Sequence, residues 1–384
     1  MQKAYKFSLR PTKKQAKILQ QYLDECRWLY NLLLEQRKLA YEELGSPLTW
    51  TQQKAFLPLL KEERSSLILV YSQVLQDVTV RLDRAFQAFF RRCKAGENPG
   101  FPRFRNFHRY DSFCYPQSGF CLERKFLQLS KIGRIRIKQH RPIVGIIKTC
   151  TIRKDASGHW HVSFSCIVET NPLPRNDKAV GIDLGLEHFA ALKSWNASTW
   201  EEKQEPSIEN PRFFRKEEKE LAKAQRKLSS AEKGTSERKK CRKLVAKIHE
   251  RIRNKRADFC HKQSRNLIDK YQYICLEDLN TQKMLKEAPR PLAKSIADAS
   301  WNQFCQYLSY KAEEAGRKLG WVDPRGTSQI CSRCQVLVPK ELSQRRHDCP
   351  HCGYSTHRDF NSSEVILARG LAGLGLLPLE AHPL

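Results

Sequence analysis

The stretch AVGIDLGLEHFAAL, residues 179–192, decides the fold of this chain. Two apolar runs flank Gly185, which predicts a buried strand, a glycine turn and a second strand. Asp183 stands inside the first run, between Ile182 and Leu184. A carboxylate in an apolar strand is costly unless it is paired with a cation or bound to a metal. Asp183 is therefore the first candidate functional residue.

Two further carboxylates follow in similar settings. YQYICLEDLN, residues 271–280, is typical of a third buried strand, and Glu277 stands at its carboxyl end. HRDFNSSEVIL, residues 357–367, places Asp359 just before a helical pattern. Each acid alone has an ordinary interpretation: Asp359 as a helix N-cap, Glu277 as a surface charge, or either as half of a structural ion pair.

Together, the strand Asp, the strand-end Glu and the helix Asp resemble the RuvC-type RNase H fold. There the acids come from two neighbouring parallel strands and from a helix that packs over them. Three such carboxylates hold two divalent cations about 3.5–4 Å apart for in-line attack on a phosphodiester. Hard oxygen ligands select magnesium or manganese rather than zinc. The resemblance implies that Asp183, Glu277 and Asp359 are catalytic metal ligands.

The HRD triplet at residues 357–359 also occurs in the catalytic loop of protein kinases. That loop carries an Asn five residues after its Asp, whereas position 364 is Glu. No glycine-rich phosphate loop, V-A-I-K strand or D-F-G triplet accompanies it. The triplet is therefore not a kinase motif in this chain.

Four cysteines follow a metal-binding pattern. Cys331 and Cys334 form one pair, and Cys349 and Cys352 form a second after a spacer of fourteen residues. This spacing predicts a tetrathiolate zinc site of the ribbon or knuckle type, and four thiolates leave no open position for catalysis. We expect His347 and His351 to be surface residues rather than ligands. The other cysteines are scattered singly, which indicates a reducing compartment.

The charge of the chain indicates a polyanionic partner. Its 384 residues carry 69 Lys and Arg against 41 Asp and Glu, a formal net charge of +28. Such an excess is the footprint of nucleic-acid binding, and a solubilising surface rarely needs so much. No apolar run is long enough to span a membrane, and the N-terminus lacks a secretory apolar region. We expect a cytoplasmic protein that acts on nucleic acid.

The remaining sequence falls into blocks of different character. A strand is predicted at residues 4–10, followed by a helical region to residue 95 in which residues 73–92 form a clear amphipathic helix. Short alternating runs predict a small β domain at residues 101–170, and residues 170–178 form a linker. A helical hairpin is predicted at residues 213–269, one helix at 292–318, and a strand that begins at WVDP, residues 321–324.

These motifs occur in the order found in a known family. GIDLG, ICLEDLN, VDPRGTSQICSRC, CPHCG and HRDFNSS together resemble the TnpB family, transposon-encoded nucleases related to type V CRISPR effectors. The resemblance covers nearly the whole chain. It implies an RNA-guided DNA endonuclease whose guide RNA derives from the transposon end. The target is double-stranded DNA beside a short motif that the protein reads, and base pairing carries most of the specificity.

The resemblance also implies a domain organisation. A RuvC-like α/β nuclease domain of the RNase H fold spans residues 173–325 and 357–384, interrupted by a zinc module that binds target nucleic acid at 326–356. A wedge-like β-barrel domain spans residues 1–10 and 96–172 and carries an inserted helical recognition lobe at 11–95. Placed by segment, the nucleic-acid contacts are Gln76, Arg103, Arg105 and Arg325.

Three positions depart from the family pattern. His357 stands where an acid is frequent, Ser362 where alanine is usual, and Gln335 where a second glycine is expected. No metal ligand is lost, so these changes alter the surroundings of the metals rather than their ligands. Two alternatives remain: an RNA-guided DNA-binding protein that does not cleave, and a RuvC-type structure-specific resolvase. A transposase proper needs a further catalytic set that the sequence does not show.

Overall fold

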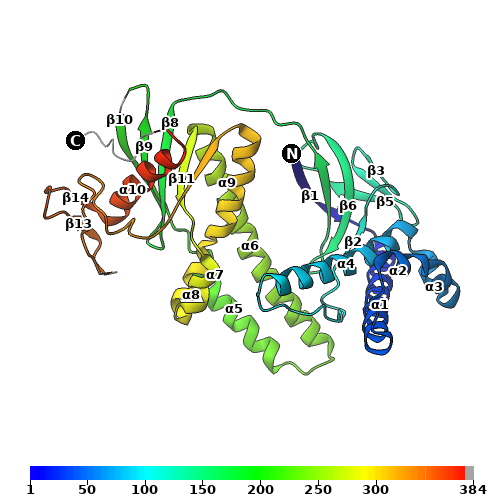
Figure 1. Cartoon of the computed structure of the whole chain (residues 1–384). Coiled ribbons are helices and arrows are strands. Elements are labelled where there is room, and N and C mark those ends of the chain that lie inside the picture. Colours follow the sequence, from blue (N-terminus) through cyan, green and yellow to red (C-terminus); the bar gives the residue numbers. More distant parts are fainter. Residues whose placement is uncertain (200, 342, 377–384) are drawn as a thin grey trace. The chain divides into compact units, whose positions relative to one another are not determined.

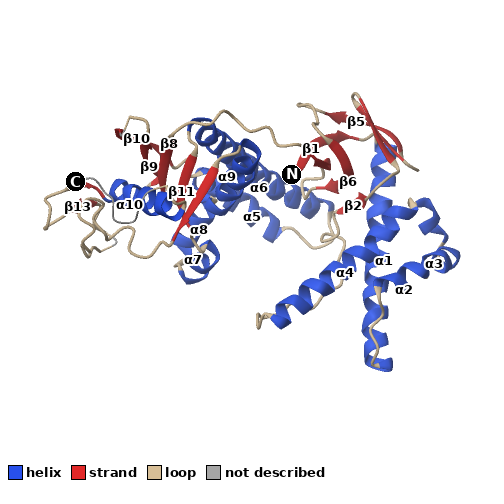
Figure 2. Cartoon of the chain, turned by 45° about the horizontal axis from the view of Figure 1, so that its top comes forward, coloured by secondary structure: helices blue, strands red, loops and turns tan. Residues whose placement is uncertain are grey.

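The computed structural model describes residues 1–199, 201–341 and 343–376, and the chain divides into two compact units. The N-terminal unit spans Met1–Glu169 and the C-terminal unit Thr170–Leu384. Figure 1 labels most elements of both units, and Figure 2 shows their helices and strands by colour. The last part of the predicted nuclease domain, residues 377–384, lies outside the described residues.

One antiparallel sheet of seven strands forms the base of the N-terminal unit. Its order is β2-β6-β7-β1-β5-β4-β3. The strands are β1 (Gln2–Arg10), β2 (Ser112–Tyr115), β3 (Phe120–Glu123), β4 (Phe126–Leu129), β5 (Gly133–Lys138), β6 (Ile146–Lys154) and β7 (Trp160–Ile167). The strand predicted at residues 4–10 therefore joins the later strands, pairing with both β5 and β7.

This sheet curls strongly on itself. β2 and β3 stand at opposite edges of the hydrogen-bonded order, yet only residues 116–119 separate them in the chain. A link of four residues spans no more than about 18 Å, so the two edges must lie close together. The rings of Tyr115 and Phe120, one from each edge, are 6.5 Å apart between centroids. The sheet thus has the form of a partly open barrel.

Helices between β1 and β2 pack onto the sheet in one common core. They are α1 (Lys13–Leu44), α2 (Trp50–Ala55), α3 (Leu57–Glu63), the 3-10 turn η1 (Ser65–Leu69) and α4 (Ser72–Lys94). Helix α1 begins at a capping box in which Thr12 and Gln15 satisfy each other's backbone N–H groups, and it ends at Gly45, whose φ is 61°. The rings of Tyr22 from α1 and Phe113 from β2 are 5.2 Å apart.

The C-terminal unit contains a mixed sheet in the order β10-β9-β8-β11-β12. Its strands are β8 (Lys178–Leu184), β9 (His188–Asn196), β10 (Glu201–Glu209), β11 (Tyr273–Glu277) and β12 (Lys318–Val322). β8, β11 and β12 are parallel, whereas β9 and β10 run antiparallel to their neighbours. The predicted α/β class is confirmed for this unit. The sequence did not predict β10, and WVDP ends β12 instead of beginning a strand.

Helices cover both faces of this sheet (Figure 1). α6 (Ser236–Lys270) and α9 (Trp301–Ala315) pack on one face, and α10 (Arg358–Gly373) packs on the other. The remaining elements are α5 (Phe213–Ser230), α7 (Thr281–Glu287), α8 (Arg290–Ala299) and the hairpin of β13 (Arg346–Asp348) and β14 (Ser355–His357). No helix in the described part of the chain is long and apolar enough to cross a membrane.

Two helix predictions have different outcomes. The helical hairpin predicted at 213–269 is confirmed, since α5 and α6 are separated only by residues 231–235. The single helix predicted at 292–318 is wrong, because Ser300 adopts a left-handed conformation (φ 58°) that separates α8 from α9. Asp298, two residues before this break, is 6 % exposed.

Candidate active site and cysteine cluster

The alternation of side chains along two parallel strands places Asp183 and Glu277 on the same face of the sheet. In β8, Ile182 packs in the core under α6 and α9, whereas Ala179 packs in the core under α10. Asp183 shares the face of Ala179. In β11, Cys275 also packs under α10, so Glu277 two residues later shares that face. Both carboxylates therefore stand at the carboxyl ends of neighbouring strands, on the side that α10 covers.

Glycines let α10 approach the sheet closely enough to bring in the third acid. A Cβ at Gly181 would lie 2.1 Å from the carbonyl oxygen of Ser363 in α10, and a Cβ at Gly370 would lie 2.3 Å from the sulfur of Cys275. Only glycine fits at such a contact. Asp359, in the first turn of α10, lies beside the end of β8: its Oδ2 is 3.8 Å from where a Cβ on Gly185 would be.

The three acids influence one another electrostatically. Burial first, and then the charges of Glu277 and Asp359, raise the pKa of Asp183 well above 3.8, and Arg358 only partly opposes this. Burial also raises the pKa of Glu277, against a hydrogen bond from the hydroxyl of Thr327 at 2.5 Å. The fold thus brings together three acids that the sequence separates widely. Buried like charges of this kind are stabilised by bound cations.

The acids are not packed as tightly as a metal cluster. Among the described residues, the three do not form a set whose ligand atoms all lie within 4.8 Å of one another. The three carboxylates are therefore spaced more widely than the four cysteine sulfurs.

Two residues beside Asp359 were not predicted as site residues. Glu187, His357 and Asp359 each offer a ligand atom within 4.8 Å of the others. The Nδ1 atom of His357 accepts the backbone N–H of Asp359 at 3.3 Å, so the histidine caps α10. Glu187 follows Asp183 by four residues, just after the glycine turn, and its carboxylate lies 3.3 Å from the Nε atom of Arg345. The tight turn between β8 and β9 was the available sequence signal.

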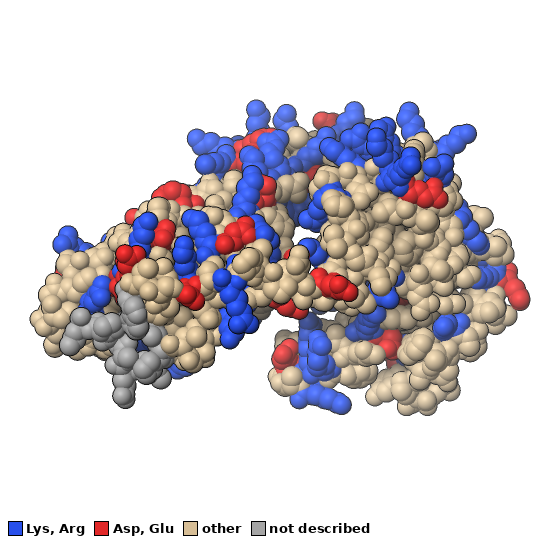
Figure 3. All heavy atoms as spheres, turned by 90° about the horizontal axis from the view of Figure 1, so that it is seen from above, with Lys and Arg blue, Asp and Glu red and all other residues tan. Residues whose placement is uncertain are grey.

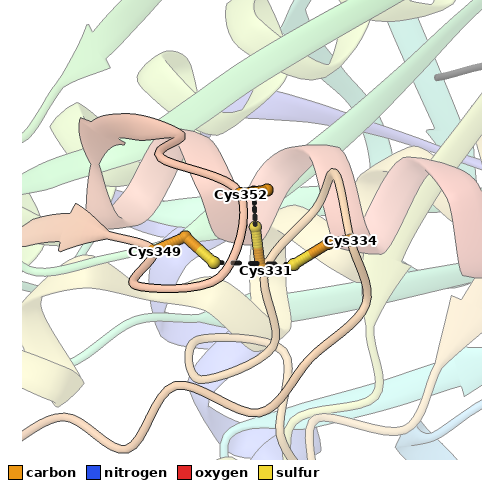
Figure 4. Close-up of side chains that lie close together, drawn as sticks. All are labelled: Cys331, Cys334, Cys349 and Cys352. Carbon is orange, nitrogen blue, oxygen red and sulfur yellow. Dashed lines mark hydrogen bonds between the residues drawn. The ribbon is translucent and has the colours of Figure 1, made fainter.

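The four cysteines converge from two loops, as Figure 4 shows. The sulfurs of Cys331 and Cys352 are 3.7 Å apart, and those of Cys334 and Cys349 are 3.5 Å apart. All four sulfurs lie within 4.8 Å of one another. A tetrahedral zinc ion with bonds of about 2.3 Å requires sulfur separations of about 3.8 Å. The cluster therefore fits one such ion.

The surroundings of the sulfurs differ between the two pairs. Burial raises the pKa of the Cys331 thiol to about 12. Burial acts in the same direction on Cys349, but backbone N–H groups of Cys352 and His351, together with the thiols of Cys334 and Cys352, lower the pKa of Cys349 to about 6. Cys349 is thus held ready as a thiolate, the form that binds metal.

Matching turns follow the second cysteine of each pair. Gly353 has φ 74° and Gln335 has φ 59°, so both adopt the left-handed conformation. The absent glycine at 335 therefore leaves the turn in place at a cost of about 1–2 kcal/mol. His351 is exposed as predicted, but His347 is completely buried, so its prediction as a surface residue is wrong. The ammonium group of Lys340 hydrogen-bonds its Nδ1 atom.

The predicted nucleic-acid contacts lie in both units. Gln76 is half-buried on α4, and Arg103 and Arg105 are exposed on the loop that follows it. Asn31 hydrogen-bonds the backbone of Arg105 at both its N–H and its C=O group, which fixes this loop on α1. Arg325, with a side chain 90 % exposed, follows β12 and pairs with Asp323 at 2.7 Å. Figure 3 shows Lys and Arg spread over the face drawn, with Asp and Glu scattered among them.

Three family models match the chain. The model described as "Probable transposase" matches residues 163–288, the "Cas12f1-like, TNB domain" matches 301–366, and a "Helix-turn-helix domain" matches 1–46. The last description does not fit the structure, in which residues 1–46 form strand β1 and the single long helix α1. The second match contains all four cysteines and Asp359.

Solved structures share the fold at low sequence identity. A Cas12f1 chain from a complex with guide RNA and target DNA has a TM-score of 0.59 at 13 % identity, covering 92 % of this chain and 83 % of that chain. A chain of the RNA-guided endonuclease CRISPR-Cas_phi3 has a TM-score of 0.50 at 10 % identity, covering 100 % and 94 %.

Curated proteins match over nearly the full length. A Streptomyces pristinaespiralis protein named "Putative RNA-guided DNA endonuclease" is 34 % identical over 380 residues, covering 97 % of this chain and 90 % of that protein. The Escherichia coli K12 protein named "Putative RNA-guided DNA endonuclease InsQ" is 29 % identical over 390 residues, covering 97 % and 93 %. The chain belongs to the TnpB family of RNA-guided DNA endonucleases.

Proposed function

We propose that this protein is a transposon-encoded RNA-guided DNA endonuclease that cleaves target DNA phosphodiesters at Asp183, Glu277 and Asp359. One observation carries the assignment: three acids from β8, β11 and α10 meet on one face of the sheet, where two of them raise the pKa of the third. Membership in the family supplies the substrate class. The strand order and the position of α10 support a RuvC-like domain of the RNase H fold.

The donor set supports divalent cations at the acids and zinc at the cysteines. When bound, two magnesium or manganese ions supply charge that activates a water molecule and stabilises the leaving 3'-oxygen. Both other acids act on Asp183, so the three carboxylates together would hold the cations. Thr327 orients Glu277 through its hydroxyl, and His357 orients the first turn of α10. Four thiolates around zinc serve structure rather than chemistry.

The observed elements support the predicted division into functional parts. The curled sheet of β1–β7 corresponds to a wedge domain at residues 1–10 and 96–172, and α1–α4 to a recognition lobe at 11–95. The five-stranded sheet and α10 lie within 173–325 and 357–384, and the cysteine cluster lies within 326–356. In this division the cysteine module handles target nucleic acid.

The partners follow from charge and family. The net charge of +28 favours a polyanionic partner, and we propose that it is a guide RNA paired with one strand of double-stranded target DNA. We propose that Gln76 reads the motif beside the target and that Arg103, Arg105 and Arg325 contact phosphates. Phe104 is exposed beside Arg103 and offers a stacking surface for a base. A protein with this substrate acts at the nucleoid in the cytoplasm.

The test begins with the RNA that the protein carries. The protein is purified from cells that contain its native flanking DNA, and the bound RNA is sequenced. We expect one RNA species that ends in a variable segment copied from beyond the transposon end, and cleavage of a matching plasmid with magnesium. Asp183→Ala should abolish cleavage while RNA and target binding persist.

Other results would favour other functions. Target binding without cleavage by the parent protein would indicate a guided DNA-binding protein. Random cellular RNA that moderate salt removes, with cleavage confined to branched DNA, would indicate a structure-specific resolvase. Cleavage by Asp183→Ala at the parent's rate would refute the assigned acids.

A further inference from the structure

The loop that carries the first cysteine pair is bound directly to the helix that carries Asp359. Ser332, between Cys331 and Cys334, is 2 % exposed, and its backbone N–H donates to Oδ1 of Asn361 at 2.9 Å. The Nδ2 atom of Asn361 donates to the carbonyl of Ile330 at 2.8 Å. One amide side chain on α10, itself fully buried, therefore holds the backbone on both sides of Cys331.

A buried carboxylate one turn further along α10 holds both cysteine pairs. Glu364 is 7 % exposed, and the hydroxyl of Ser332 donates to its Oε2 at 2.5 Å. The hydroxyl of Tyr354, two residues after Cys352, donates to its Oε1 at 3.0 Å. Lys193 from β9, itself 7 % exposed, donates to Oε1 at 2.7 Å. Glu364 thus joins both halves of the cysteine module to the sheet.

These contacts lie close to the catalytic end of the same helix. Asn361 and Glu364 follow Asp359 by two and five residues, which is about 3 and 7.5 Å along a helix axis. A helix transmits a displacement over such a distance nearly without loss, because its backbone hydrogen bonds keep it rigid. A shift of the cysteine module that moves Asn361 and Glu364 would therefore also move Asp359 relative to Asp183 and Glu277.

We propose that the cysteine module is a positioning element for the nuclease centre: the metal held by its four thiolates fixes Ser332 and Tyr354, which set the position of Asp359 through Asn361 and Glu364. The inference rests on the proposed function for its consequence in catalysis. It goes beyond that function, because the module there serves only to handle target nucleic acid. Asn361 and Glu364 are positioning residues, and neither is among the three acids.

The test measures how the three acids bind a cation when the cysteine module keeps its zinc but loses its hydrogen bonds to α10. Ser332→Ala removes one hydroxyl donor, and Glu364→Gln keeps the shape of the side chain but removes its charge. Ser355→Ala is the matched control: Ser355 is an exposed residue of β14 in the same module, and its hydroxyl bonds Asp348 and Arg346 rather than α10. Binding of Mn²⁺ to the full-length protein with its RNA is followed by electron paramagnetic resonance. The signal that Asp183→Ala abolishes defines the site.

We expect Ser332→Ala and Glu364→Gln to weaken Mn²⁺ binding at this site by on the order of tenfold, the usual effect of losing a partner that orients a metal ligand. The magnesium concentration for half-maximal cleavage should rise in parallel, with zinc content and target affinity unchanged. Ser355→Ala should match the parent. If Ser332→Ala loses its zinc, the comparison of Mn²⁺ affinity between the parent and Glu364→Gln tests the proposal instead.

Two outcomes overturn the proposal. Unchanged Mn²⁺ affinity in Glu364→Gln with zinc retained would show that the contact does not position Asp359. If the variants bind target DNA more weakly but bind Mn²⁺ as the parent does, the module serves only to bind nucleic acid. A parent protein that binds Mn²⁺ but does not cleave would refute the proposed function while the Mn²⁺ comparison between variants still tests the positioning.

Discussion

Gly181→Ala tests whether the close contact between α10 and the sheet positions the active site. The new Cβ would lie 2.1 Å from the carbonyl oxygen of Ser363 and 2.6 Å from the Cβ of Leu367. Neither is the end of a flexible side chain, so the helix must move by roughly 1 Å to restore ordinary contact distances. Overpacking of this kind costs about 1–3 kcal/mol, which lowers Tm by about 2–12 °C in a unit of this size.

The effect on catalysis should exceed the effect on stability. Ser363 and Asp359 belong to the same helix, and Gly181 and Asp183 to the same strand, so the shift separates two of the three acids. A misplacement of about 1 Å reduces catalysis by on the order of a hundredfold. The assay is single-turnover cleavage of a matched target at saturating RNA, at a temperature well below the Tm of the variant.

A second glycine on α10 provides the control. Gly373 ends the helix, and a Cβ there would meet nothing within 4 Å. Gly373→Ala should therefore cleave like the parent, with a stability equal to the parent's or higher by up to about 1 kcal/mol. If Gly181→Ala cleaves and unfolds like the parent, the close contact does not position Asp359 and the reasoning fails.

Four further predictions concern the acids, the cysteines, the core and the charged surface. The pKa of Asp183 is raised because the ionised form is disfavoured in the metal-free fold. Below about pH 4 the carboxyl is protonated in both folded and unfolded chains and the fold carries no penalty, and as the pH rises through the folded pKa the fold loses stability. In EDTA the Tm of the parent should therefore fall relative to that of Asp183→Asn as the pH rises above about 4, and magnesium should remove the difference; parallel curves would contradict this. Cys349→Ser should lose the bound zinc in metal analysis, and an unchanged zinc content would exclude Cys349 as a ligand. Asp298→Asn removes the charge and one acceptor oxygen of a buried carboxylate that binds Arg256 and a backbone N–H group of α5, which should cost about 3–5 kcal/mol in urea unfolding, whereas the exposed Asp258→Asn should cost less than about 1 kcal/mol. Arg103→Ala should lower the slope of log K against log salt for target binding by about 1, and an unchanged slope would mean that it touches no phosphate.

The acids were predictable because their setting is local. Asp183 and Glu277 stand in short apolar runs that predict buried strands, where a carboxylate is costly unless it is paired or bound to a metal. The cysteines were predictable because two pairs at fixed spacing imply one metal. The closeness of Asp359 to the other acids was not derivable from spacing: it depends on Gly181 and Gly370, whose lack of a side chain admits α10.

The features that the sequence did not predict have physical causes of their own. β10 has the sequence EEKQEPSIE, whose charges and proline oppose strand formation, and it forms because an edge strand with irregular register tolerates them. The break at Ser300 was hidden because the helical pattern continues across it. The contacts of Ser332 with Asn361 and Glu364 join residues from separate motifs, and no periodicity reports such a pairing.

The order in which the acids occur along the chain has a consequence during protein synthesis. A ribosome completes β8 and β11 long before α10, so a nascent or prematurely terminated chain that stops short of α10 carries Asp183 and Glu277 without Asp359. Such a fragment also leaves Cys275 and Gly181 of the sheet without the cover of α10. The three acids can therefore come together only after α10 has been synthesised.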